Sequence, residues 1–220
     1  TCGSEATKPI FARTFGVSRR IIKPIGEPRV DYLLDSDTYQ ANRQLILSKY
    51  PGLKGKKVVL YAPTFRRGHR IHPSELIRQF DLHDYALIIK QHRLDKTKLP
   101  KSDSIIQIKD EFDSLELLPI ADYVVTDYSA LTFEAALLHK PLYFWTYDYD
   151  TYTQECGLAM DYQHEMPGII AKRAKTIADA IKNNRCSPRK IAQFANKWIA
   201  VQDGTCTKKI VGLLGLWALS

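Results

Sequence analysis

The stretch from Tyr123 to Trp145, YVVTDYSALTFEAALLHKPLYFW, constrains the fold more than any other part of the chain. It opens with a short apolar run, crosses a polar turn, and continues into a nearly uncharged segment from Ala130 to His139. Pro141 then introduces a second apolar run, Leu142 to Trp145. A strand, a turn, a helix and a second strand in this order indicate a parallel sheet. Because the helix is apolar almost all round, we expect it to be buried.

The polar turn from Thr126 to Ser129 is the first candidate site. Free backbone N–H groups at the start of a helix, together with the helix dipole, attract anions and phosphate above all. Asp127 or Ser129 can cap the helix with a side-chain oxygen. Glu134 is the only acid in the helix, and an unpaired buried carboxylate is costly. We therefore expect Glu134 to meet either a ligand's hydroxyl groups or a nearby basic side chain.

The rest of the chain continues this alternation of strands and helices. Further strands are predicted at Lys57 to Tyr61, Tyr85 to Ile89, Ser104 to Ile108 and Gly168 to Ala171. Further helices are predicted at Ser74 to Phe80, Ser114 to Leu118, Ala174 to Asn184 and Pro188 to Val201, and the segment Leu33 to Tyr50 is expected to become helical after Asp35 to Asp37. Continuous apolar strands between helices predict an α/β fold, a Rossmann-like parallel sheet flanked by helices on both faces.

Both ends of the chain are harder to interpret. Ser4 to Arg29 contains no complete unit, although Arg19 to Lys23 resembles a short strand and Gly26 to Arg29 a turn. The tail, Ile210 to Leu219, is apolar but only ten residues long. That length is too short to span a bilayer, so we expect a docked helix.

Three polar clusters follow predicted strands, where ligands bind in parallel sheets. The clusters are Thr64 to Arg67, Lys90 to Arg93 and Thr126 to Ser129. In this arrangement Arg66 offers a forked phosphate contact, and Lys90 and His92 offer further positive charge. The alternative is that Arg66 is a solvated loop charge and His92 a surface histidine. The convergence of the clusters predicts one anion-binding site at the carboxyl edge of the sheet.

An aromatic-rich segment, expected to form a loop, follows the second apolar run and holds more candidates. Its acids and nearby Asp161 can hold a metal or a ribose, and its tyrosines can stack on a base; these residues are Tyr147, Asp148, Tyr149, Asp150 and Tyr152. Turn capping by the acids and packing of the tyrosines explain the same pattern. No metal site is predicted, because the chain has no cluster of Cys and His at zinc spacing.

The charge balance limits the partners. With 32 basic and 24 acidic residues the formal net charge is +8, which favours anionic partners such as nucleotides, anionic polymers or an acidic membrane face. No nucleic-acid-binding motif is present, so nucleic acid is not an expected partner. The four cysteines are far apart and form no C-x-x-C pair, which fits a reduced, cytoplasmic location.

Several segments together resemble the CDP-glycerol glycerophosphotransferases, which build teichoic acid and related capsule polymers. They are APTFR (Ala62 to Arg66), KQH (Lys90 to His92), VTDYSALTFEAALLHKP (Val125 to Pro141), Tyr147 to Tyr152 with Gly157, and the earlier Ser4-Glu5 and Gly26 to Asp31. The resemblance runs from about Ser4 to Gly204, and the TDYS…FE…KP block is its most specific part.

The resemblance implies the C-terminal half of a GT-B fold, in which two Rossmann-like domains face each other across a cleft. Residues 1–30 would be a junction from the end of a missing N-terminal domain. Residues 31–204 would form the donor-binding domain, and residues 205–220 a C-terminal helix. The family's Trp-His-Gly motif, whose histidine is thought to act as base on the acceptor hydroxyl, does not occur here.

The resemblance also implies site residues and partners. By the family pattern, His92, the predicted catalytic residue, and the turn with Thr126, Asp127 and Ser129 would contact the donor's phosphates. Beside the resemblance, the chemistry of the side chains and of the helix start makes Arg66, Lys90, Ala130 and Glu134 candidates for binding the nucleotide and its phosphates, with Thr64 and Asp148 as further candidates. The donor would be CDP-glycerol or CDP-ribitol, without a cofactor, and the acceptor an anionic polymer or a lipid-linked chain. The inner face of the cell membrane is a further candidate partner, because acidic lipids attract a basic surface.

Two other functions fit the same sequence. One is a nucleotide-sugar glycosyltransferase domain, which shares the fold and the diphosphate site. The other is a nucleotide-binding fragment without catalysis, whose partner carries the base. Competition between UDP-sugars and CDP-alcohols separates the first from the main hypothesis, and turnover by the isolated chain rules out the second.

Overall fold

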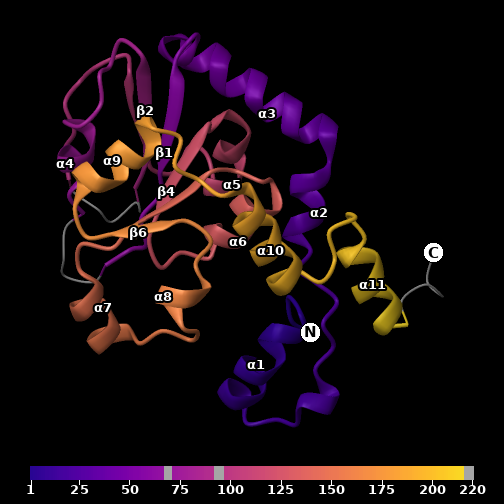
Figure 1. The fold of residues 1–220 in the computed structure, drawn as a ribbon. Helices are drawn as coiled ribbons and strands as arrows, with labels where there is room; N and C mark the ends of the chain where they lie inside the picture. The colour runs from indigo at the N-terminus through magenta and orange to yellow at the C-terminus, as the bar shows by residue number, and fades with distance from the viewer. Residues whose placement is uncertain (67–70, 92–96, 216–220) are drawn as a thin grey trace.

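The computed structural model describes residues 1–66, 71–91 and 97–215. Its centre is a six-stranded parallel sheet in the order β3-β2-β1-β4-β5-β6 (Figure 1). The strands are β1 (Lys57–Tyr61), β2 (Tyr85–Lys90), β3 (Ile105–Ile108), β4 (Tyr123–Thr126), β5 (Leu142–Trp145) and β6 (Ile169–Ala171). All five neighbouring pairs run parallel. The predicted α/β class with a Rossmann-like sheet is therefore confirmed.

Both faces of the sheet are covered, as the continuous apolar strands predict. Val58 and Leu60 face a core built with α3 (Ser36–Lys49), α5 (Ser114–Leu117), α6 (Leu131–Leu137) and α10 (Pro188–Trp198). Val59 and Tyr61 face the opposite core, built with α4 (Pro73–Ile77) and α9 (Ala174–Lys182). Alternate residues of one strand thus enter different cores, which explains why the whole run is apolar.

The strand order changes direction between β1 and β4, which places a crevice at the carboxyl ends of these strands. The segments that leave the two strands are bonded to each other. The Ala62 amide donates to the Val125 carbonyl at 3.0 Å, and Thr126 Oγ1 donates to the Ala62 carbonyl at 2.8 Å. The crevice therefore has a fixed floor made from two parts of the chain.

The junction at the start of the chain differs from expectation. It contains η1 (Glu5–Thr7), α1 (Lys8–Phe15), η2 (Arg19–Ile21) and α2 (Arg29–Leu34). The predicted strand at Arg19 to Lys23 is wrong, because these residues form a 3₁₀ turn capped by Ser18 Oγ. Helix α1 was missed although its signals are present: Pro9 lies in its first turn, and Gly16, with φ of 64°, ends it.

The segment after β5 also differs. Residues expected to form a loop make α7 (Tyr149–Cys156), followed by the short α8 (Tyr162–Glu165). Tyrosine, threonine and aspartate have modest helix propensity, so packing rather than local preference decides the conformation here. The remaining short helices are η3 (Pro51–Leu53) and η4 (Leu118–Ile120).

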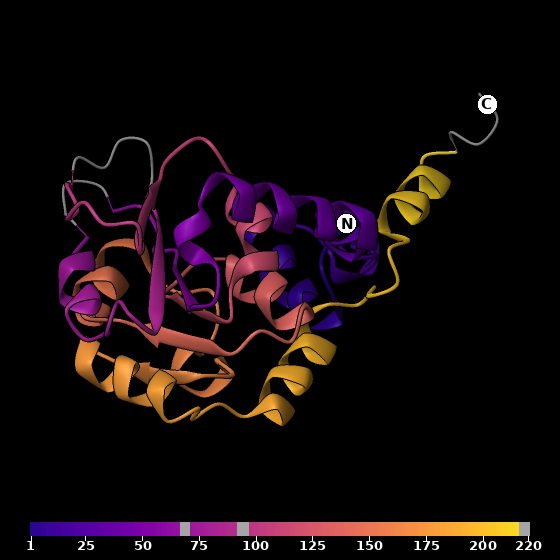
Figure 2. The same cartoon turned by 90° about the horizontal axis from the view of Figure 1, so that it is seen from above.

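The chain ends in α11 (Cys206–Leu213), which extends away from the body (Figure 2). Its first turn is docked, because the Asp31 carboxylate accepts the Cys206 and Thr207 amides at 2.9 and 2.7 Å. The docked helix was expected at Ile210 to Leu219 instead, and the last four residues of that range lie outside the described residues. The apolar end of α11 is not covered, since Leu213 is 54% and Leu214 66% exposed. Among the described residues, no helix has both the length and the apolar character that a bilayer-spanning segment needs.

Candidate functional site

The turn before α6 is held by its own polar groups. Ser129 Oγ accepts a hydrogen bond from the Leu131 amide at 3.2 Å, and the Ser129 carbonyl accepts one from the Thr132 amide at 3.2 Å. Ser129, and not Asp127, therefore supplies the side-chain oxygen at the start of the helix. Ser129 is half-buried and Ala130 is exposed, so this turn is reachable from solvent.

Ser129 borders a pocket of about 240 Å³ at the carboxyl ends of the central strands. Its lining comes from four separate segments: Ala62, Pro63, Phe65, Lys90, Gln91, Lys109, Asp110, Ser114 and Ser129. The predicted meeting of Lys90 with the turn before α6 is thus present in the structure. Lys90 Nζ is held at the rim by a hydrogen bond to the Lys109 carbonyl.

Sequence reasoning missed part of this lining. Lys109 and Asp110 directly follow β3, where the same rule about strand ends would have located them. His92, predicted to act on the donor, lies outside the described residues, as does Arg67. The pocket combines two lysines with one acid, which suits a ligand that carries both negative charge and hydrogen-bonding groups.

Arg66 and Asp127 lie next to this pocket but bind each other. Asp127 is fully buried and accepts hydrogen bonds from the Thr64 amide at 2.8 Å, from Thr64 Oγ1 at 2.6 Å, and from Arg66 Nη2 at 2.8 Å. Arg66 also forks onto Asp148 through Nε and Nη2, and its Nη1 donates to the Thr64 carbonyl at 2.7 Å. Its guanidinium side chain is only 3% exposed.

The charges in this cluster stabilise one another. Burial disfavours the charged form of Arg66, but its hydrogen bond to Asp148 and the charge of Asp127 raise the pKa of Arg66 above its usual value. Burial likewise opposes ionisation of Asp148, yet hydrogen bonding and the charge of Arg66 lower the pKa of Asp148. Arg66 and Asp148 are therefore expected to be charged at neutral pH.

Two of the three tyrosines predicted to stack on a base, Tyr147 and Tyr152, lie against Arg66 together with Tyr128, whereas the third, Tyr149, packs against the rings of Tyr128 and Tyr162. The rings of Tyr128, Tyr147 and Tyr152 have centroids 5.6, 5.2 and 5.9 Å from the guanidinium carbon. Tyr128 stacks on Tyr152 at 3.8 Å and donates to Asp148 Oδ1 at 3.2 Å. The contacts of these tyrosines are therefore packing contacts, which was the alternative to stacking on a base.

The remaining acids of this region are also engaged. Asp150 pairs with Lys172 at 2.6 Å, and Asp161 contacts His164 at 2.9 Å. Thr126 is fully buried and bonded to the backbone, as described above. Within the described part of the chain, no group of His, Cys, Asp and Glu side chains is arranged to hold a metal ion.

Glu134 lies in a different cavity, of about 230 Å³, lined by Gly3, Thr7, Ile10, Phe11, Glu27, Val30, Phe133, Glu134, Ala159, Met160, Trp198 and Ile199. The Glu134 side chain is 2% exposed and pairs with Arg29 through Oε1. Oε2 has no hydrogen-bond partner among the residues that the structure describes. Burial raises the pKa of Glu134 to about 7, although the charge of Arg29 opposes this shift. Of the two partners expected for Glu134, a ligand's hydroxyl groups or a nearby basic side chain, the structure shows the basic side chain, Arg29.

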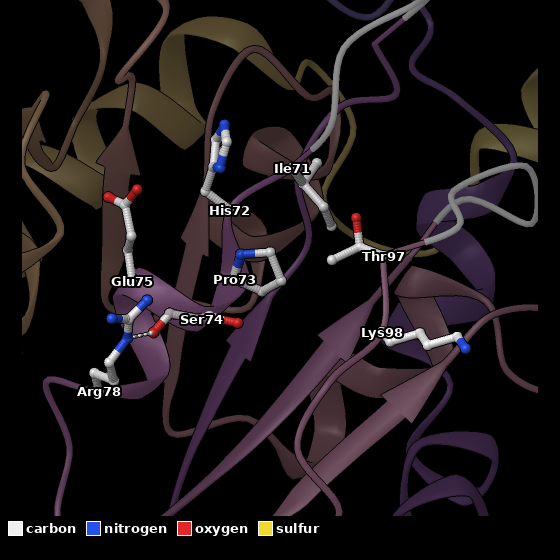
Figure 3. A pocket seen from close by; sticks show the side chains of 8 residues that line it. All are labelled: Ile71, His72, Pro73, Ser74, Glu75, Arg78, Thr97 and Lys98. Carbon is white, nitrogen blue, oxygen red and sulfur yellow. Dashed lines mark hydrogen bonds between the residues drawn. The ribbon is translucent and has the colours of Figure 1, made fainter.

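A third hollow, of about 640 Å³, lies between α4 and the segment that precedes β3 (Figure 3). His72, Glu75, Arg78 and Lys98 line it, and Arg78 Nε donates to the Ser74 carbonyl at 3.0 Å. The ring of His72 lies 5.3 Å from that of Tyr147, which places this hollow beside the Arg66 cluster. Because the hollow is lined by both acidic and basic side chains, its charge favours no particular class of ligand.

Comparison with known proteins adds to this geometry. The model of the CDP-Glycerol:Poly(glycerophosphate) glycerophosphotransferase family matches residues 1–215. The chain belongs to this family. Membership agrees with the sequence resemblance and with the position of the pocket at the carboxyl ends of the strands.

Relatives in this family include the teichoic acid glycerol-phosphate transferase of Staphylococcus aureus, 32% identical over 91% of this chain and 56% of the relative. The teichoic acid glycerol-phosphate primase of Bacillus subtilis is 31% identical over 97% of this chain and 56% of its own length. The ribitol-phosphate polymerase TarK of S. aureus is 29% identical over 94% of this chain and 43% of its length. The chain spans about half the length of these relatives.

Among solved structures, the wall teichoic acid polymerase TagF superimposes with a TM-score of 0.81 at 27% identity, over 97% of this chain and 56% of TagF. A TagF variant soaked with CDPG gives the same TM-score at 28% identity. The glycerophosphotransferase fold expected from the sequence, a Rossmann-like domain from the C-terminal half of a GT-B protein, is confirmed by these matches.

Proposed function

We propose that this chain is the donor-binding half of a transferase that moves glycerol phosphate or ribitol phosphate from a CDP-alcohol to a teichoic acid or capsule polymer. The observation that carries the proposal is the pocket in which Lys90 and the turn at Ser129 meet at the switch point of the sheet. Family membership supports the CDP-alcohol as donor. Relatives named for glycerol phosphate and for ribitol phosphate both match, so the alcohol is left open between these two.

The reaction determines what the pocket must do. Attack of an acceptor hydroxyl on the phosphorus of the alditol phosphate breaks its bond to the bridging oxygen, and CMP leaves with additional negative charge. Fixed cations and hydrogen-bond donors stabilise such charge where water is excluded. Lys90, Ser129 and the exposed backbone at Ala130 are placed for this task. His92 is proposed to assist on the donor, and no cofactor or metal is included in the step.

The acceptor side is proposed to come from a second domain. Relatives about twice as long as this chain support this idea. The junction also carries exposed apolar side chains, with Phe15 at 68% and Ile21 at 65%, which fit packing against another part of the protein. We place the catalytic base for the acceptor hydroxyl in that domain. An anionic or lipid-linked acceptor at the inner membrane face fits the net charge of +8.

Titration calorimetry of the folded chain tests this function. We expect CDP-glycerol or CDP-ribitol to bind at least about tenfold more tightly than a UDP-sugar, which corresponds to about 1.4 kcal/mol. Ser129→Ala should weaken binding roughly threefold to tenfold, because one hydrogen-bonding group at the pocket is lost. Ser48→Ala, on the exposed side of α3, is the matched control.

Two outcomes would contradict the proposal. Absence of any heat from CDP-alcohols or CDP with protein that is folded by circular dichroism would reject donor binding. Tighter binding of a UDP-sugar than of either CDP-alcohol would favour the nucleotide-sugar glycosyltransferase domain instead.

A further inference from the structure

The cluster of Arg66, Asp127 and Asp148 is not used in the reaction described above. Its members come from three segments that follow β1, β4 and β5. None of the three lines the pocket of about 240 Å³, although each of the first two lies close in sequence to a residue that does. Phe65 precedes Arg66, and Ser129 lies two positions after Asp127.

We propose that Arg66 is a positioning residue, which fixes the turn at Ser129, and with it the donor pocket, by bridging Asp127 and Asp148. The inference rests on the proposed function for its ligand, and it gives Arg66 and Asp127 a role other than direct phosphate contact. Asp148 holds Arg66 by accepting hydrogen bonds from its Nε and Nη2.

The bonding of Arg66 supports this role. Its Nε and Nη2 are directed to Asp148, Nη2 also to Asp127, and Nη1 to the Thr64 carbonyl. With 3% of its side chain exposed, the guanidinium has no free face toward the pocket. Tyrosine rings cover it at 5.2 to 5.9 Å. A planar fork with these donors holds two carboxylates in one geometry, which a lysine cannot do.

Asp127 transmits this constraint to the turn. Its carboxylate is held by Thr64 and Arg66 on one side, and its carbonyl accepts the Tyr162 hydroxyl at 2.7 Å on the other. The backbone on both sides of the residue is therefore fixed before any ligand arrives. Burying these charged side chains costs solvation energy. Buried ion pairs can in turn restrict the chain to one conformation, which is the role inferred here for Arg66.

Because the cluster is charged, positioning and electrostatics predict opposite effects of an Asp148 substitution on CDP-glycerol binding. One arginine and two carboxylates leave a net negative charge beside a pocket for a diphosphate. Removing the charge of Asp148 should improve the binding of an anion if electrostatics alone matters. It should also improve binding if Arg66 is released to contact phosphate. Loss of positioning predicts the opposite, weaker binding.

The experiment compares wild type with Asp148→Asn, which keeps the shape of the side chain. CDP-glycerol titrations at a temperature where both proteins are folded should give a dissociation constant about tenfold higher for the variant, which corresponds to about 1.4 kcal/mol. Asp179→Asn is the matched control, because it removes the same charge from an exposed pair on α9. It should change the constant less than twofold.

Hydrogen exchange of the unliganded proteins separates this inference from the proposed function. Amides from Thr126 to Ala130 should exchange at least about fivefold faster in Asp148→Asn than in wild type, because their support is weakened. If wild type binds no CDP-glycerol, the proposed function fails while this comparison still decides whether Arg66 fixes the turn.

Equal or tighter CDP-glycerol binding by folded Asp148→Asn would overturn the inference, as would unchanged exchange of the turn. Should this variant not fold, Thr64→Val provides the same test. It removes only the hydroxyl that donates to Asp127 at 2.6 Å and leaves every charge in place. We expect about threefold weaker binding from the loss of this one hydrogen bond.

Discussion

Two cavities of nearly equal volume, about 240 and 230 Å³, adjoin α6 and differ in almost every other property. The polar cavity, bordered by Ser129, is lined by strand-end loops with Lys90, Lys109 and Asp110. The apolar cavity, bordered by Glu134, is lined mainly by the junction segment and by side chains such as Trp198. One helix therefore separates a surface suited to an anion from one suited to apolar contacts.

The origin of each lining explains the difference. Loops at the carboxyl ends of parallel strands can change without disturbing the sheet, so they carry ligand contacts. The apolar cavity instead lies where the junction meets α6 and α10, and its walls continue the hydrophobic core. We therefore expect substitutions at the polar cavity to alter binding, and substitutions at the apolar cavity to alter stability.

The largest effect is expected at Trp198. This side chain is 5% exposed and packs on Phe194 and Phe133 with ring centroids 6.2 and 6.3 Å apart. Trp198→Ala should lower the free energy of unfolding by about 3 kcal/mol, because it opens a larger cavity in the core. Urea denaturation measures this change. Phe15→Ala, at a side chain 68% exposed, is the control, and equal losses for both variants would contradict the comparison.

A charge placed at the polar cavity should have the next largest effect. Ser129→Asp sets a carboxylate where the donor's diphosphate is proposed to lie, and like charges at short distance repel. We expect CDP-glycerol affinity to fall by about 100-fold, or about 2.7 kcal/mol, with an unchanged melting temperature. Ser48→Asp makes the same change of charge on α3 and should bind as wild type. A Ser129→Asp protein that retains full affinity would place the donor elsewhere.

The smallest effect concerns Glu134 and depends on pH. Burial raises the pKa of Glu134 from 4.5 to about 7, so the folded state holds a proton that the unfolded state releases between these values. The stability from this group is fully present below pH 4.5 and is lost as the pH rises through 7. Glu134→Gln should remove this dependence, which amounts to about 2.5 kcal/mol of unfolding free energy between about pH 5 and pH 8.

Urea denaturation at about pH 5, close to the unfolded-state pKa, and at about pH 8, above the folded-state pKa, measures the difference for both proteins. The exposed Glu75→Gln variant on α4 is the control. If Glu134→Gln shows the same change between the two pH values as wild type, Glu134 is not the source of the pH dependence and the prediction is wrong.

Much of the fold could be predicted because its signal is local. Apolar runs such as Lys57 to Tyr61 and Leu142 to Trp145 gave strand boundaries that match the structure. The position of the pocket followed from the rule about strand ends. Helices α1 and α7 were missed, since basic residues in one and tyrosines in the other hide their amphipathic character.

The partners of the charged side chains could be predicted less well from the sequence. Arg66 and Asp127 were expected to face phosphate, but the sequence does not reveal that Asp148, distant along the chain, directs Arg66 inward. Arg29, expected only as part of a turn, pairs with Glu134. Periodicity locates a residue on an element, whereas ion pairs between loops depend on the tertiary arrangement of those loops.

The hydrogen bonds that the first two amides of α11 donate to the Asp31 carboxylate have a practical consequence. They tie the last helix to α2, whose first residue, Arg29, reaches the apolar cavity through Glu134. A protein that ends before Thr205 would lack the two amides that donate to the Asp31 carboxylate. We expect this loss to destabilise α2 and, through Arg29, the wall of the apolar cavity, although α11 does not line that cavity. Expression fragments intended for crystallography should therefore retain α11, and affinity tags are better placed beyond it.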